Sequence, residues 1–188
     1  MKGLKQTSAV ICVILAAAVL ALSADKAAPS EEQVKAAFLF NFIRFVDWPD
    51  GAFAEKTAPI VIGILGEDAL GREIERFLRG KSVQGRKLLL RKLEWPGEIK
   101  GCHILMVPAS GAKAAPEILA SVKENPVLTV GETDRFSQQG GIINFYLEGN
   151  KVRFAINIEA AERAKLKISS QLLGLAKIIR DDPRAGRM

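Results

Sequence analysis

The sequence predicts an α/β domain, a layered sandwich in which helices flank a central mixed sheet. Short apolar runs rich in Ile, Leu and Val alternate with longer segments of helical periodicity, which is typical of helices packed on a largely parallel sheet. Residues 141–157 depart from that order, because Gly149-Asn150 stands between two alternating runs and marks an antiparallel hairpin. We therefore expect a mixed sheet that includes a C-terminal β-hairpin followed by helices.

The N-terminus has the composition of a secretory signal. Lys2 and Lys5 precede an apolar run over residues 9–22, and the small residues Ser23 and Ala24 follow it. That run is shorter than the roughly 20 residues that a helix needs to span a bilayer. We expect a signal peptide over residues 1–24, a single soluble, exported domain over residues 25–180 and a flexible tail over residues 181–188, with no membrane span after cleavage.

Charge and cysteine content narrow the class of protein. The formal net charge of +6 becomes +4 without Lys2 and Lys5, because residues 1–24 contain no acidic residue. Lys and Arg are scattered, with no basic run, so we expect no nucleic-acid binding. Cys12 is lost with the signal, which leaves Cys102 alone and excludes an intrachain disulfide. We expect Cys102 to be a small buried side chain, the alternative being an intermolecular disulfide or a redox thiol.

The first helix of the mature chain is unusually apolar. Ser30 can cap it and Pro49 disfavours helical geometry just before itself, so the helix is predicted from about Glu31 to Val46. Four phenylalanines fall within residues 38–45, which predicts burial nearly all round. Arg44 lies among them, and its guanidinium must reach solvent, a carboxylate or an anionic ligand, because an unpaired buried charge is too costly.

Residues 59–130 supply the alternating elements. Apolar runs bounded by turn residues predict the strands, and amphipathic spacing predicts the helices between them. The expected strands are 59–65, 87–93, 104–107 and 127–130, and the expected helices are 66–79 and 112–123.

The hairpin has a defined register. With Gly149-Asn150 as its loop, the alternating runs place one wholly apolar face opposite a mixed polar face, and a one-residue slip would bury Arg153. The expected apolar pairs are Leu147 with Val152, Phe145 with Phe154 and Ile143 with Ile156, and the polar-face pairs are Glu148 with Lys151, Tyr146 with Arg153 and Asn144 with Ala155.

Two helices are expected after the hairpin. Asn157 can cap a short helix through about Ala164. A last helix, ending near Arg180, is predicted from a stripe of Leu172, Leu173, Leu175, Ala176 and Ile179.

No set of catalytic groups is visible in the sequence. His103 is the only histidine, which excludes multi-histidine metal sites and makes any nucleophilic triad depend on one position. Its neighbour Cys102 points to the opposite face if both lie in a strand. We expect a structural His103, no cofactor, no metal site and no enzymatic activity.

Five residues are candidates for binding a ligand or a partner. Arg44 and Trp48 lie on the first helix or just after it, and Asn144, Tyr146 and Arg153 share the polar face of the hairpin. Together they offer charged, amide and aromatic groups that suit an anionic or aromatic molecule. The alternative is that they form ordinary surface contacts and ion pairs.

Taken in order, several segments resemble the YfiR family of periplasmic proteins, over about residues 31–179. The resemblance rests on their succession after a signal peptide rather than on any one motif. They are Lys35-Ala36-Ala37-Phe38-Leu39, Trp48-Pro49, Val83-Gln84-Gly85-Arg86, Cys102-His103-Ile104-Leu105, Val127-Leu128-Thr129-Val130-Gly131, Phe136, Gly140-Gly141-Ile142-Ile143-Asn144-Phe145, Phe154-Ala155-Ile156-Asn157 and residues 166–176.

The resemblance implies a regulatory binding protein rather than a catalyst. In such a family, a periplasmic repressor binds the periplasmic sensor domain of an inner-membrane diguanylate cyclase, which lowers cyclic di-GMP and biofilm formation. A peptidoglycan-binding lipoprotein sequesters the repressor and so relieves the repression. The resemblance also implies a homodimer, and it allows a sensor kinase in place of the cyclase as the partner. The alternative function is that the chain itself is a small-ligand sensor that acts on a histidine kinase or another membrane receptor. Relatives often carry disulfide cysteines in the mature domain, whereas this chain keeps only Cys102.

Overall fold

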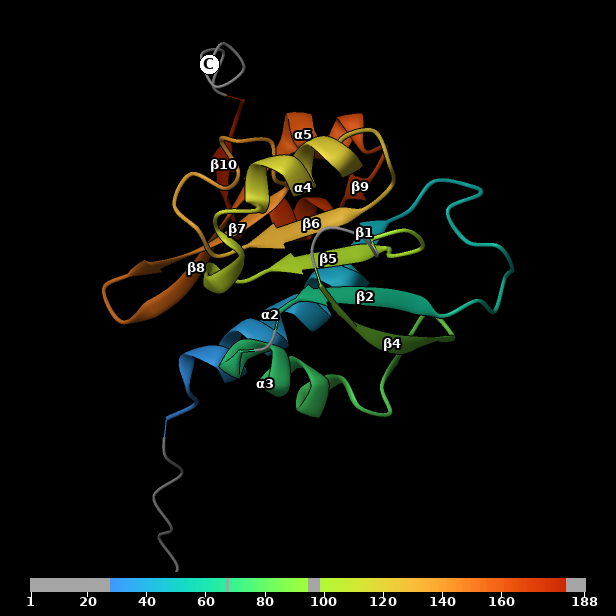
Figure 1. The fold of residues 1–188 in the computed structure, drawn as a ribbon, viewed down its shortest axis with the longest axis horizontal. Coiled ribbons are helices and arrows are strands. Elements are labelled where there is room, and N and C mark those ends of the chain that lie inside the picture. Colours follow the sequence, from blue (N-terminus) through green and yellow to red (C-terminus); the bar gives the residue numbers. More distant parts are fainter. Residues whose placement is uncertain (1–27, 67, 95–98, 182–188) are drawn as a thin grey trace, which may run out of the picture.

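The computed structural model describes residues 28–66, 68–94 and 99–181 (Figure 1). The expected signal peptide over residues 1–24, and all of the expected tail except Asp181, lie outside these residues. Within them, an eight-stranded mixed sheet carries helices on both faces. The predicted layered α/β class with its C-terminal hairpin is therefore confirmed.

The central sheet has the strand order β10-β8-β7-β6-β5-β2-β4-β3. Neighbours pair in parallel except at β7–β8 and β3–β4. A separate antiparallel pair joins β1 (Val46–Asp47) to β9 (Lys167–Ile168). The strands of the central sheet are β2 (Ile60–Leu65), β3 (Ser82–Val83), β4 (Arg86–Leu93), β5 (Ile104–Val107), β6 (Leu128–Gly131), β7 (Ile143–Glu148), β8 (Lys151–Asn157) and β10 (Lys177–Ile179).

Two apolar cores lie on opposite faces of the sheet. Alternation along β5 sends Ile104 toward the first core and Leu105 toward the second. Helices α2 (Glu31–Arg44) and α3 (Ala69–Leu78) close the first core, and α4 (Ala115–Val122) closes the second (Figure 1). The remaining helices are η1 (Ala109–Gly111), α5 (Ile158–Arg163) and α6 (Ser170–Leu173).

Helix α2 begins as predicted and ends earlier. The Ser30 hydroxyl accepts from the Gln33 N–H while the Gln33 side chain accepts from the Ser30 N–H, a complete capping box. The helix stops at Arg44, and Val46 already belongs to β1. The expectation of burial nearly all round is wrong, because one stripe alone is buried and Arg44 reaches solvent. The buried stripe consists of Ala36, Leu39, Phe42 and Ile43.

The hairpin has the predicted register at all six pairs. Its apolar face packs on α2, where the Phe42 ring lies 5.0 Å from the Phe154 ring and 5.5 Å from the Phe145 ring, measured between centroids. Leu147 lies near the tip, beyond that packing, and is 54% exposed. The register agrees with the burial of Phe145 and Phe154, because the alternating pattern places the apolar side chains of both strands on the face that packs against α2.

The predicted last helix is wrong. It is confined to α6, and residues 177–179 form β10 instead, paired in parallel with β8. Of the expected stripe, Leu172 alone is buried, and Leu175 is 72% exposed. The open edge of β8 offers backbone partners to the chain, so strand pairing overrides the helical periodicity.

Candidate functional site

The five candidate residues lie in two separate places rather than in one site. Arg44 and Trp48 are at the end of α2 and just after β1. Asn144, Tyr146 and Arg153 are on the face of the hairpin that points away from α2.

Arg44 is exposed beside aromatic rings. Its guanidinium carbon lies 5.9 Å from the centroid of the Phe40 ring and 5.8 Å from that of Phe45. The Lys81 ammonium lies 5.7 Å from the same Phe40 centroid. Two cations thus share one ring, a cation–π arrangement that leaves their charges open to an anionic group.

Trp48 lies between two hollows. Cavities of about 610 Å³ and about 420 Å³ both include it in their walls, and its ring packs edge-on against Phe53 at 6.0 Å. The indole Nε1 is buried and has no hydrogen-bond partner among the described residues. A buried donor without an acceptor is costly, so this atom suits an acceptor supplied from outside the chain.

The hairpin residues are largely engaged within the protein. In the orientation that satisfies its hydrogen bonds, the Asn144 amide donates to the carbonyls of Thr133 at 3.0 Å and Gly131 at 3.2 Å. Arg153 pairs with Glu148 at 3.3 Å, and their side chains are 49% and 66% exposed. Asn144 therefore anchors the loop after β6, while Tyr146 and Arg153 remain at the surface.

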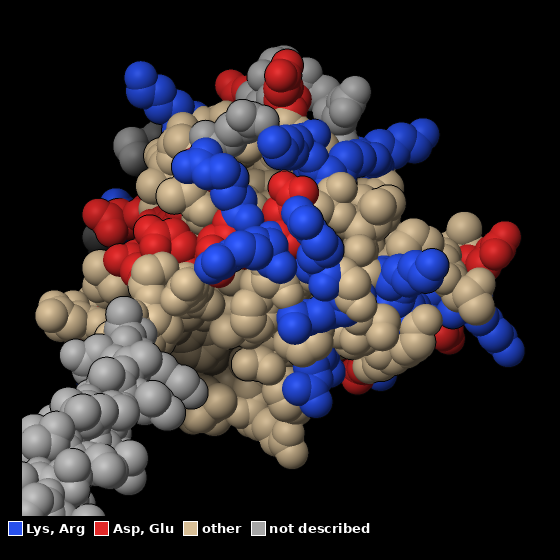
Figure 2. Space-filling model, turned by 90° about the horizontal axis from the view of Figure 1, so that it is seen from below, with Lys and Arg blue, Asp and Glu red and all other residues tan. Residues whose placement is uncertain are grey.

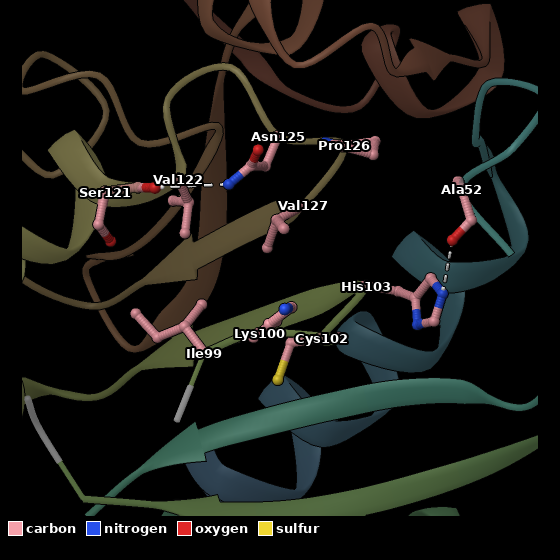
Figure 3. Close-up of a pocket in the computed structure, with 11 residues that line it drawn as sticks. Ala52, Ile99, Lys100, Cys102, His103, Ser121, Val122, Asn125, Pro126 and Val127 are labelled. Atoms are coloured by element: carbon pink, nitrogen blue, oxygen red, sulfur yellow. Dashed lines mark hydrogen bonds between the residues drawn. The ribbon is translucent and has the colours of Figure 1, made fainter. Parts of the chain in front are cut away.

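A further cavity, of about 710 Å³, opens beside the start of β5 and the end of α4 (Figure 3). Sequence reasoning missed it, because its lining comes from segments far apart in the chain that share no motif. Its lining residues are Ala52, Ile99–His103, Ser121, Val122 and Asn125–Val127.

His103 in this cavity is held as a neutral ring. Its Nδ1 accepts from the Val61 N–H at 3.1 Å, so Nε2 carries the proton and donates to the Ala52 carbonyl at 3.1 Å. The ring stacks on Phe53 at 4.3 Å. Burial lowers the pKa of His103, and the nearby positive charge of Arg86 adds to that effect, while the bond to Ala52 opposes it. Both nitrogens are engaged, as expected for a structural histidine.

Cys102 is a buried thiol, as expected. It is 6% exposed, and its sulfur lies 3.5 Å from Nη2 of Arg91. Burial raises the pKa of the Cys102 thiol even though the Arg91 charge acts in the opposite direction. Figure 3 shows the side chains of Cys102 and His103 pointing in different directions, so they do not form a nucleophile–base pair.

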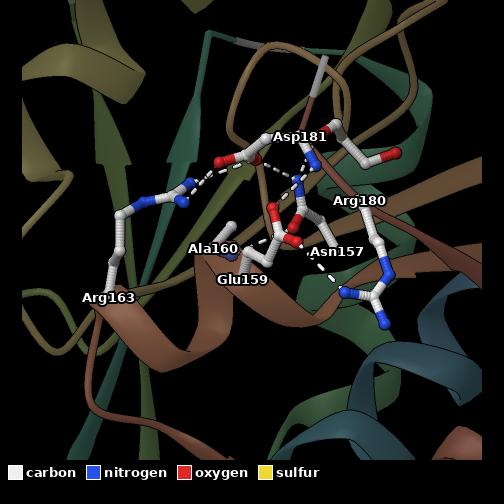
Figure 4. A network of polar contacts seen from close by, with 7 residues as sticks. Asn157, Glu159, Ala160, Arg163, Arg180 and Asp181 are labelled. Atoms are coloured by element: carbon white, nitrogen blue, oxygen red, sulfur yellow. Dashed lines mark hydrogen bonds and ion pairs between the residues drawn. The ribbon is translucent and has the colours of Figure 1, made fainter. Parts of the chain in front are cut away.

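A polar network ties the end of the described chain to α5 (Figure 4). The Asp181 carboxylate accepts from both terminal nitrogens of Arg163 and from Nδ2 of Asn157 at 2.7 Å. The Glu159 carboxylate accepts from the Asp181 N–H at 3.1 Å and lies 3.4 Å from the Arg180 guanidinium. Asn157 also caps α5 by accepting from the Ala160 N–H. This network positions β10.

The described residues offer neither a metal-binding cluster nor a membrane-spanning helix. No group of three or more His, Cys, Asp and Glu side chains there can hold a metal ion. No helix in the same ranges has the length and apolar content needed to cross a membrane.

Comparison with known proteins shows the fold and the family. A crystal structure of a conserved domain protein from Vibrio cholerae O1 biovar El Tor strain N16961 superposes with a TM-score of 0.56 at 11% identity. The match covers 79% of this chain and 60% of that one, so it shows a shared fold alone. No curated protein matches the sequence.

The family model described as YfiR/HmsC-like matches residues 32–177. That range runs from α2 through the hairpin to the first residue of β10, and so includes the other seven strands of the central sheet in full. The chain belongs to the YfiR/HmsC-like family.

Proposed function

We propose that this chain is exported to the periplasm, binds the periplasmic domain of an inner-membrane diguanylate cyclase and represses it, which lowers cyclic di-GMP. The observation that carries the proposal is the family match over residues 32–177. A protein that binds one conformation of such a receptor shifts the receptor's population toward that conformation. The free energy of this shift is set by the difference between its affinities for the two receptor conformations.

The state of the described polar groups is consistent with a binding role. Both nitrogens of His103 are hydrogen-bonded, and burial raises the pKa of Cys102. Arg44 and Lys81 lie at the surface beside the Phe40 ring, where a partner can reach them.

The test is a deletion strain combined with capture from solubilised membranes. We expect cyclic di-GMP to rise on deletion, to fall on complementation, and the tagged mature chain to retain a membrane cyclase. Unchanged cyclic di-GMP together with no retained cyclase or sensor kinase would contradict the proposal. A retained peptidoglycan-binding lipoprotein would identify the component that relieves repression.

The buried indole nitrogen of Trp48 favours a second candidate function, a small-ligand sensor that feeds a histidine kinase or another membrane receptor. Its two adjacent cavities have room for a small molecule with a hydrogen-bond acceptor. A thermal-shift screen of nucleotides, amino acids and cell-wall fragments tests it. Stabilisation that Trp48→Phe abolishes supports the sensor, since phenylalanine keeps an aromatic ring and removes the donor; no stabilisation by any of them contradicts it.

A further inference from the structure

Helix α2 carries a second, mostly apolar stripe on its side toward α3. Val34, Ala37, Phe38 and Asn41 recur at the spacing i, i+3, i+4, i+7, and all four are partly exposed. That spacing aligns side chains along one side of a helix. Arg44 continues the same line beyond Asn41. The Phe38 ring also packs on the hairpin, 5.3 Å from the Phe154 ring between centroids, so the stripe borders the core and leaves Val34, Ala37 and Asn41 as its members without a ring contact to the sheet.

This second stripe forms one wall of a groove, and α3 forms the other. We call it the α2–α3 groove; its volume is about 770 Å³, and Phe77 lines it from α3. Glu73 and Arg76 line it beside Phe77 and pair through two hydrogen bonds, of 3.0 Å and 2.8 Å. Apolar side chains bounded by satisfied polar groups are the anatomy of a binding interface.

The groove has opposite charges at its two ends. Glu31 and Glu32 stand at the start of α2, where Glu31 pairs with Lys35 and Glu32 accepts from the Ser30 hydroxyl. At the other end, Lys81 lies 4.7 Å from the Phe77 centroid, and it shares the Phe40 ring with Arg44. Among the described residues, neither Arg44 nor Lys81 has a carboxylate within ion-pairing distance. Figure 2, which shows the molecule from the α3 side, has Lys and Arg gathered across the middle of this face and the largest group of Asp and Glu on its left.

The α2–α3 groove is concave, so its occupant must be convex. The groove between two adjacent helices accepts a third helix. The third helix is held by apolar side chains that recur at i, i+3, i+4 and i+7. A second copy of the chain related by a two-fold axis through this surface would bring the same hollow against it. Two facing grooves leave a void, whereas a single helix fills one.

We propose that the α2–α3 groove binds one amphipathic helix of the partner protein, with the acidic C-terminal end of that helix over Arg44 and Lys81. The negative end of the helix dipole adds to the attraction of its acidic side chains there, and the positive N-terminal end meets Glu31 and Glu32. The inference rests on the proposed function, since the helix belongs to the periplasmic part of the receptor.

Site-specific photo-crosslinking in the native host tests the proposal. The probe is p-benzoylphenylalanine in place of Val34, with the same residue in place of Leu175, which is 72% exposed, as the matched position outside the groove. Adducts are digested and the crosslinked peptide is sequenced by mass spectrometry. We expect position 34 to yield a receptor peptide with apolar residues at helical spacing and Asp or Glu toward its C-terminal end, and position 175 not to yield it.

Charge variants provide the second measurement. Arg44→Gln with Lys81→Gln should lower the crosslinking yield at position 34 by about tenfold, since each exposed ion pair is worth about threefold in affinity. Lys56→Gln with Lys113→Gln removes the same charge from exposed positions outside the groove and should leave the yield unchanged. Equal losses in the two double variants would show general electrostatic attraction and overturn the assignment.

The remaining outcomes also decide the matter. A crosslinked peptide from this chain itself, one without an acidic end, or no adduct above the level at position 175 overturns the groove proposal. The proposed function then still stands if deletion raises cyclic di-GMP and the cyclase is still captured. If deletion leaves cyclic di-GMP unchanged and no receptor is captured, the proposed function fails, whatever the crosslinks show.

Discussion

The carboxylate of Asp181 is expected to hold β10 in place, and Asp181→Asn tests this. Burial alone would raise the pKa of Asp181, but hydrogen bonds from Arg163 and Asn157 outweigh it and hold that pKa below its usual value. Hydrogen bonds to a charged group are worth about 1.5–3 kcal/mol each when buried. Because the Asp181 and Arg163 side chains are 34% and 30% exposed, solvent screening reduces that sum, and we expect a net loss of about 1–2 kcal/mol.

The sign of the pH dependence follows from that lowered pKa. The unfolded state binds the proton more tightly, so the carboxylate contributes its full stability above the unfolded pKa of about 3.9 and loses it as the pH falls through the folded pKa. The asparagine variant should therefore lose stability at pH 7 and show a flatter dependence below about pH 4 than the wild type.

Urea unfolding and amide hydrogen exchange of residues 177–179 measure this effect. Asp134→Asn, at an exposed position, is the matched control and should change neither. A double-mutant cycle with Arg163→Gln should give a coupling of about 1 kcal/mol. The reasoning is refuted if Asp181→Asn unfolds like the wild type at pH 7 and the β10 amides keep their protection.

Two substitutions and one titration test the core and the cavity. Phe42→Ala removes a fully buried ring and should cost about 3–5 kcal/mol in urea unfolding, and a loss below about 1 kcal/mol would contradict the packing. Gly141→Ala should destabilise by about 1–3 kcal/mol, since the new Cβ would lie 2.2 Å from the Phe136 ring, whereas Gly174→Ala, with 3.4 Å to its nearest atom, should be nearly neutral. His103 should titrate by NMR below its unfolded value of about 6.5, so that its neutral ring stabilises the fold above that pH and the stability is lost as the pH falls through the folded pKa; titration at or above 6.5 would refute its burial.

Local signals in the sequence were sufficient for most elements. The alternating runs around Gly149-Asn150 predict all six pairs of the hairpin, because a slip would exchange its apolar and polar faces. Ser30 and Asn157 cap the helices that they were predicted to cap. These features depend on residues within a few positions of each other, where spacing alone determines which side chains meet.

Features that depend on distant pairing could not be predicted. Residues 177–179 have helical spacing, but the edge of β8 makes them a strand. The contact of His103 with Ala52 spans 51 positions, and the cavity beside it has no sequence signature. Arg44 was recognised as a charge that must reach solvent, a carboxylate or an anionic ligand, yet the groove that begins one turn before it appears only when α3 is placed beside α2.

The two edges of the central sheet affect the tendency of the protein to aggregate. Its outermost strands, β10 and β3, have three and two residues, so parts of the longer strands β8 and β4 remain uncovered. The uncovered parts carry Lys151 and Arg153 in β8 and Arg91 and Lys92 in β4, and no acidic residue. Edge-to-edge pairing of two copies would place the positive side chains of one copy beside those of the other. This repulsion disfavours growth of a continuous sheet even at high local concentration.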